Sequence, residues 1–94
     1  MDMVALEVKL DQNKVFNSVR VELTVKNKHN SLTEGVLLEH TVYIIEGAVE
    51  RGGILVPLNG VPRKNGEYSF FEVMFRNQAD LKAFINALKN GYLQ

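Results

Sequence analysis

The C-terminal part of the chain combines two hydrophobic patterns, which predict a strand that leads directly into an amphipathic helix. In residues 67–76 apolar side chains fall on both parities of a strand, and residues 77–92 have helical spacing. Asn77 is a favourable N-cap, and Gly91 suits the left-handed position just beyond a helix. The helix has one apolar stripe at i, i+3, i+4 and i+7, formed by Leu81, Phe84, Ile85 and Leu88. We expect this stripe to pack on a sheet.

Two N-terminal segments alternate between apolar and polar residues and predict an antiparallel hairpin. In the first segment, residues 4–10, even positions hold Val4, Leu6, Val8 and Leu10. In the second, residues 15–25, odd positions hold Val15, Val19, Val21, Leu23 and Val25. The polar cluster Asp11–Lys14 between them predicts the turn. Such alternation is typical of a sheet with one face in the core and one in water.

The middle of the chain is apolar at consecutive positions, which indicates burial on two sides. Residues 36–46 read VLLEHTVYIIE, and the β-branched residues among them favour a central strand, although a buried helix would satisfy the same pattern. The preceding residues 27–35 predict a polar loop, in which Ser31–Glu34 have capping-box spacing and form one helical turn at most. Glycines on both sides of residues 48–51 indicate a short connection.

Two turn dipeptides, Asn59-Gly60 and Asn65-Gly66, precede the last strand. Residues 54–58 alternate again, but Pro57 cannot donate to a sheet ladder, so we expect an edge strand or a bulge. The dipeptide Asn65-Gly66 predicts a tight turn, and residues 61–66 become the tip of a hairpin. In the last strand, one face carries Phe71, Val73 and Phe75, and the other carries Tyr68, Phe70 and Met74.

These elements together predict one small α+β domain over residues 1–94. Its sheet has four to six antiparallel strands in meander order and is strongly twisted or barrel-like, and one C-terminal amphipathic helix packs on it. A chain of 94 residues has room for one hydrophobic core.

The composition restricts the class of protein. Eleven basic and eleven acidic residues give a formal charge of zero, so no long-range attraction draws the whole chain to nucleic acid or anionic lipid. Cysteine is absent, which fits a reducing compartment and removes thiol catalysis. No apolar run approaches the roughly 20 residues of a membrane helix, and the first residues do not resemble a signal peptide. We expect a cytoplasmic protein that does not enter a membrane.

Residues that carry catalysis or bind metals are few. His29 lies in the polar loop, and His40 in the apolar segment is better explained as a hydrogen-bonded residue beside the core than as a catalytic base. Neither histidine has a second one at metal-ligand spacing, and no phosphate-binding glycine pattern or nucleophile-elbow serine occurs. Four glutamates are more simply a solvated surface than a metal site: Glu34, Glu39, Glu46 and Glu50. We expect no enzyme, no bound metal and no cofactor.

Two functions remain for such a chain. The leading hypothesis is a non-catalytic protein-interaction domain, a small subunit, adaptor or inhibitor, that binds a protein partner or a second copy of itself. Residues 36–45 and 68–75 offer apolar side chains to two faces, whereas one helix covers only one, so a strand edge or an apolar sheet face is left for a partner.

The alternative is a nucleic-acid or phosphate-ligand module with a basic hairpin tip. Arg63 and Lys64 on the tip, joined by Arg51, would contact phosphates, and Tyr68 would stack on a base. A solvated hairpin tip carries such charges as well. These four residues are the candidate contact residues for a ligand or partner.

Overall fold

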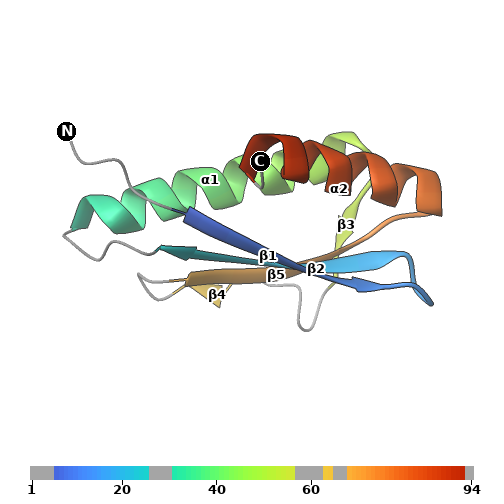
Figure 1. Cartoon of the computed structure of the whole chain (residues 1–94), viewed down its shortest axis with the longest axis horizontal. Coiled ribbons are helices and arrows are strands. Elements are labelled where there is room, and N and C mark those ends of the chain that lie inside the picture. The colour runs from blue at the N-terminus through green and yellow to red at the C-terminus, as the bar shows by residue number, and fades with distance from the viewer. Residues whose placement is uncertain (1–5, 26–30, 57–62, 65–67, 93–94) are drawn as a thin grey trace.

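Two helices lie side by side on one face of an open antiparallel sheet (Figure 1). This computed structural model describes residues 6–25, 31–56, 63–64 and 68–92. Within them, the strands are β1 (Leu6–Asn13), β2 (Ser18–Val25), β3 (Ile54–Leu55), β4 (Arg63–Lys64) and β5 (Tyr68–Met74), and the helices are α1 (Ser31–Glu50) and α2 (Gln78–Tyr92). The α+β class, the antiparallel sheet and the C-terminal helix are therefore confirmed.

The strand order differs from the predicted meander. β2 lies between β1 and β5, and the short strands β3 and β4 both pair with β5. Since β2 already occupies one edge of β5 along its whole length, β3 and β4 share the other edge, β3 beside Met74 and β4 beside Phe70. Within the described residues the sheet therefore ends at β1 on one side and at β3 with β4 on the other, and it is open and not closed into a barrel. The predicted edge position of the strand at residues 54–58 is confirmed for β3, whereas Pro57 lies outside the described residues.

The first hairpin has the predicted antiparallel pairing but a later turn. β1 continues through Asn13, which pairs with Ser18, so Asp11–Lys14 is not the turn. The chain reverses over residues 14–17, where Asn17 adopts a left-handed φ of 51°. Asparagine tolerates this conformation better than most residues. Val15, predicted to belong to the second strand, is exposed in this turn.

Asn17 also fixes the hairpin turn to the far end of β5. Its carbonyl oxygen accepts the backbone N–H of Phe75 at 2.9 Å. Its side-chain amide donates to the carbonyl of Arg76 at 3.4 Å and accepts from the side chain of Gln78. These bonds hold the start of α2 against the first hairpin.

Residues 36–46 are the largest correction to the sequence-based prediction, because they lie in α1 and not in a strand. The helix begins at Ser31 and continues through Glu50, so the single helical turn predicted at Ser31–Glu34 extends over 20 residues. Its β-branched residues are accommodated: the Thr41 hydroxyl donates to the carbonyl of Leu37 at 2.7 Å. One row of α1 packs on β2 and β5, namely Leu37, Thr41, Ile44 and Ala48. Burial of this row outweighs the modest strand preference of the sequence.

A glycine pair ends α1. Gly52 has a left-handed φ of 84°, and its N–H donates to the carbonyl of Val49 at 2.9 Å. The N–H of Gly53 donates to the carbonyl of Ala48 at 2.8 Å. These two bonds form a Schellman motif, which satisfies carbonyls that the helix leaves without partners. The predicted connection at residues 48–51 is therefore the last turn of a helix.

The C-terminal helix is the element that the sequence predicts best. The Asn77 side chain accepts the N–H of Asp80 at 2.9 Å, as expected for an N-cap. The predicted stripe is buried in full: Leu81, Phe84, Ile85 and Leu88. Gly91 is different, because it lies within the helix, which ends at Tyr92, and does not adopt the left-handed conformation.

The two faces of the sheet differ in chemistry. The face under the helices holds Val8, Val19, Val21, Leu23, Val25, Phe71, Val73 and Phe75, all buried. On the opposite face, the Ser18 hydroxyl donates to a carboxylate oxygen of Glu72 at 2.8 Å, and Nε of Arg20 lies 3.5 Å from the other oxygen. Glu72 is only 8% exposed. A polar cluster therefore occupies the centre of the face that the predictions assigned to a partner.

Candidate functional site

The outer side of α1 carries a second row of apolar side chains. Leu38, Val42 and Val49 are 43%, 44% and 57% exposed, and Ile45 is partly buried. Their spacing of four, three and four residues places them along one line of the helix, which is the spacing of a coiled-coil seam. We call these four residues the α1 flank.

The α1 flank explains why residues 36–46 are apolar on both sides. One side is the row that packs on the sheet, and the other is the flank. On helical geometry, the flank lies about half a turn from Tyr43 and Gly47, which face α2. It therefore points away from α2, and the part of the chain that the structure describes leaves it accessible to water.

Acidic residues follow the outward ridge of α1 beside the flank. Glu39, Glu46 and Glu50 are exposed, and residues 31–50 contain no lysine or arginine. Glu50 lies in the last turn, where the helix dipole disfavours negative charge. A neutral protein thus has one markedly acidic helix, and Arg51, which directly follows it, places one cation at its end.

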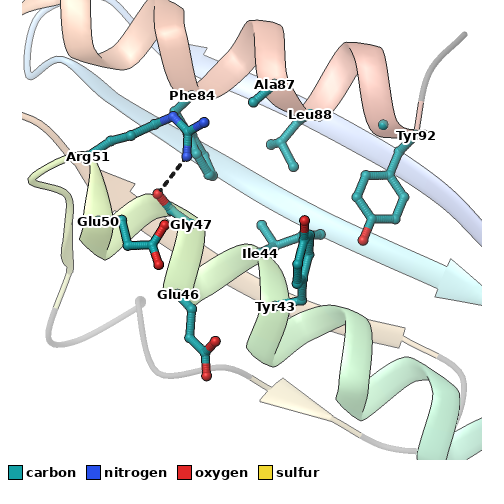
Figure 2. Close-up of a pocket in the computed structure, with 11 residues that line it drawn as sticks. Tyr43, Ile44, Glu46, Gly47, Glu50, Arg51, Phe84, Ala87, Leu88 and Tyr92 are labelled. Atoms are coloured by element: carbon teal, nitrogen blue, oxygen red, sulfur yellow. Dashed lines mark hydrogen bonds between the residues drawn. The ribbon is translucent and has the colours of Figure 1, made fainter.

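A groove of about 270 Å³ separates α1 from α2 on the other side of the ridge (Figure 2). Ile44, Phe84 and Leu88 form its apolar floor, since all three are buried in the core. The groove is open because the facing positions of the two helices are small, namely Gly47, Ala87 and Gly91. Tyr43 and Tyr92 stand at one end of it, and Glu50 and Arg51 at the other.

The aromatic end of the groove is held by a histidine. The Tyr92 hydroxyl and Nδ1 of His40 are 2.8 Å apart, and the two rings meet edge to face with centroids 5.5 Å apart. Partial burial raises the pKa of the Tyr92 hydroxyl above its ordinary value, and the neighbouring Tyr43 raises this pKa further. His40 lies in helix α1 and not in the predicted strand. The hydrogen bond to Tyr92 agrees with the structural explanation of His40.

The four candidate contact residues lie on three different segments of the backbone. Arg51 follows α1, and its guanidinium donates to the carbonyl of Gly47 at 3.0 Å. Arg63 and Lys64 form β4 and pair with Phe70 and Ser69, and the predicted turn at Asn65-Gly66, which follows them, lies outside the described residues. β4 pairs near the start of β5, whereas β3, which directly follows the turn at Arg51, pairs near its end. Tyr68 is the first residue of β5.

The remaining sequence predictions concern His29, metal binding and membrane-crossing helices. His29 lies outside the described residues. Among the residues that the structure describes, no group of three or more histidine, aspartate or glutamate side chains is arranged to hold a metal ion. Neither α1 nor α2, as described, has the length and hydropathy of a membrane-crossing helix.

Comparisons with known proteins add no relationship. The chain matches no protein-family model, and no curated protein is significantly similar to it in sequence.

The residues of the α1 flank and of the groove were missed because they depend on the helical state of α1. The sequence did contain a signal for this state. Gly52 and Gly53 directly after a long apolar segment are typical of a helix end, and Ser31–Glu34 are typical of a helix start. Read together, these two signals delimit α1 and its two apolar rows.

Proposed function

We propose that the protein is a non-catalytic protein-interaction domain that binds an amphipathic helix of a partner protein on the α1 flank. The observation that carries this proposal is a row of aliphatic side chains, at coiled-coil spacing, that remains exposed on α1. The sequence predicted a partner surface on the sheet, whereas the surface proposed here lies on α1. The absence of cysteine fits the cytoplasmic location that we propose with it.

The energetic argument concerns the exposed part of the flank. Complete burial of an aliphatic side chain contributes roughly 1.5–3 kcal/mol, and Leu38, Val42 and Val49 each retain about half of that surface for a partner. The three residues would together contribute roughly 2–5 kcal/mol. This contribution is smaller than the usual cost of association, so additional contacts from the partner are required.

Charge favours a foreign helix over a second copy of this chain. Glu39 and Glu46 border the flank, so an α1 to α1 contact would bring glutamates of two copies together. A partner helix with lysine or arginine beside its apolar seam would pair with them instead. The outer edge of β1 is the alternative for strand addition, but Lys9 in the middle of this strand disfavours such pairing.

The phosphate-ligand hypothesis has weaker support. It requires the three basic residues on one surface, and Arg51 lies near the opposite end of β5 from Arg63 and Lys64. Its guanidinium also already has a carbonyl acceptor.

Two synthetic helical peptides test the proposed function. Both have three heptads with a leucine seam, and one carries lysine and the other glutamate beside the seam. Fluorescence anisotropy should show binding of the lysine peptide, and Val42→Glu should weaken it at least about 10-fold because a charge would enter the apolar contact. Asn86→Glu, on the exposed side of α2, is the matched control and should leave the affinity unchanged.

Several results would contradict the proposal. The first is that neither the lysine peptide nor the glutamate peptide binds. The second is an equal loss of affinity in Asn86→Glu. The third is a dimer in sedimentation velocity that Val42→Glu dissociates. The last result would assign the flank to a second copy. A loss of unfolding free energy above about 1 kcal/mol in Val42→Glu would also contradict it, because a surface change costs less and the flank would then be covered by the chain itself.

A further inference from the structure

The groove between α1 and α2 is a second candidate site, on the other side of α1 from the flank. Its floor is apolar, its wall is aromatic at one end, and its other end lies near the C-terminus of α1. We propose that this groove binds one arginine or lysine side chain from a peptide segment of a protein ligand. This inference concerns a different surface from the proposed function and does not depend on the α1 flank.

The volume of the groove lies just below the usual range for small-molecule sites. Sites for small molecules and cofactors usually enclose about 300–1,000 Å³, and this groove has about 270 Å³. Its lining extends from Tyr43 and Tyr92 at one end to Glu50 and Arg51 at the other, between two helices that run in opposite directions (Figures 1 and 2). A long, unbranched side chain fits such a space better than a compact ligand.

The lining supplies a partner for each part of a long basic side chain. Phe84 and Leu88 on the floor are suited to methylene groups, which lysine and arginine bury while the charged group stays in water. The Tyr43 ring, 70% exposed, offers an aromatic face for the cation. Glu50 offers a carboxylate, whereas Glu46 points away from α2 (Figure 2).

The chain already places one guanidinium in this environment. Arg51 lines the groove, and its Nη1 donates to the carbonyl of Gly47 at 3.0 Å (Figure 2). This acceptor lies in the last turn of α1, at the negative end of the helix dipole. The contact shows within the molecule that a guanidinium is accommodated at this end of the groove. A cation from a ligand would therefore use Tyr43 and the carboxylate of Glu50 and not this carbonyl.

Gly47 and Gly91 keep the groove open, although the packing around these two positions does not require glycine. A Cβ atom added at Gly47 would meet nothing closer than Nη1 of Arg51 at 3.6 Å, and one added at Gly91 would meet no atom within 4 Å. Glycine costs about 0.5–1 kcal/mol relative to alanine inside a helix. The two glycines therefore destabilise their helices and leave space between them.

Nuclear magnetic resonance titration of the labelled protein tests the proposal. The probes are the peptides acetyl-Gly-Arg-Gly-amide and acetyl-Gly-citrulline-Gly-amide, which differ only in charge. We expect shifts of the backbone amides at Gly47, Gly91 and Tyr92, and affinity at least about 5-fold higher for the arginine peptide. Equal affinities, or shifts that map elsewhere, would overturn the proposal.

Matched substitutions on α2 locate the binding. Ala87→Phe fills the groove and should abolish these shifts, whereas Ala83→Phe, one turn away and outside the groove, should retain them. An equal loss in both variants would overturn the assignment. If Ala87→Phe does not fold, Glu50→Gln serves instead, with weaker arginine binding and unchanged citrulline binding as the expected result and unchanged binding of both as the contrary one. Val42→Glu should not alter these shifts, so failure here is separable from failure at the α1 flank.

Discussion

Three glycines lie within seven residues at the end of α1. Alanine should raise the free energy of unfolding at one of them and lower it at the other two. Gly53 lies in close contact with its surroundings: an added Cβ would stand 2.7 Å from Cγ1 of Val73, 2.8 Å from the carbonyl oxygen of Ala48 and 2.9 Å from Cε1 of Phe75. The carbonyl cannot move away, because it accepts the N–H of Gly53 in the Schellman motif. We expect Gly53→Ala to lower the free energy of unfolding by about 1–3 kcal/mol, as overpacking does.

Gly47→Ala should have the opposite effect. The position is helical, and the added methyl group meets only the end of the Arg51 side chain, at 3.6 Å. Removal of the glycine penalty should raise the free energy of unfolding by about 0.5–1 kcal/mol. Gly52→Ala should fall between the two, with a loss of about 1 kcal/mol, because its φ of 84° strains any side chain but requires no repacking.

Urea denaturation followed by circular dichroism gives the three differences in one experiment. The expected order of stability is Gly47→Ala, wild type, Gly52→Ala and Gly53→Ala, with a span of about 2–4 kcal/mol. The same series distinguishes the helix from the strand that the sequence favoured. If residues 36–46 formed a strand that turned at Gly47, alanine there would destabilise the protein. A loss above about 0.5 kcal/mol for Gly47→Ala, or no loss for Gly53→Ala, would refute the structure of this region.

Three other substitutions test the core and the aromatic end of the groove. Phe84→Ala should cost about 3–5 kcal/mol in urea denaturation, since Phe84 is 2% exposed and its ring packs on Phe75; a loss below about 1 kcal/mol would contradict this burial. Ser69→Ala should raise stability by about 1 kcal/mol, because its buried hydroxyl has no hydrogen-bond partner among the described residues, and a clear loss would reveal one. Tyr92 has a raised pKa, so its contribution to stability is present below about pH 10 and is lost as the pH rises through the folded-state pKa. The difference in unfolding free energy between wild type and Tyr92→Phe should therefore shrink above about pH 10, and a constant difference would contradict the shift.

The elements that the sequence predicts correctly are those whose signals are local. In α2, a cap, a single apolar stripe and a charged outer face all indicate one structure. In β2, strict alternation marks the buried face from Val19 to Val25. The position of the first turn was wrong because it depends on a distant contact: Asn17 bonds to Phe75 and Arg76, almost 60 residues away. No local preference contains that information.

The strand order and the candidate site depended on α1, where local and global signals disagree. Thr41, Val42 and Ile44 favour a strand, yet their spacing also builds a helix with two apolar rows. Once this segment is a helix, β2 pairs with β5, and the predicted excess of apolar strand becomes the exposed α1 flank. The prediction of Arg63 and Lys64 as contact residues depends on a turn signal, and a turn signal does not show which residues converge in space.

Charge neutrality of the whole chain conceals an asymmetry that the fold makes relevant to binding. Residues 31–50 contain four glutamates and no lysine or arginine, so the other 74 residues carry eleven basic and seven acidic side chains, a formal charge of +4 against −4 for α1. At physiological salt, charges interact over about 8 Å, whereas the molecule extends over 41 × 29 × 20 Å. A ligand at α1 is therefore influenced mainly by the charge of α1 and little by the net charge of the whole chain. The composition argument against nucleic acid used the net charge of the whole chain. It does not bear on a basic protein partner. Because the α1 flank and the groove both adjoin the acidic ridge of this helix, we propose that both surfaces favour cationic ligands over neutral or acidic ones.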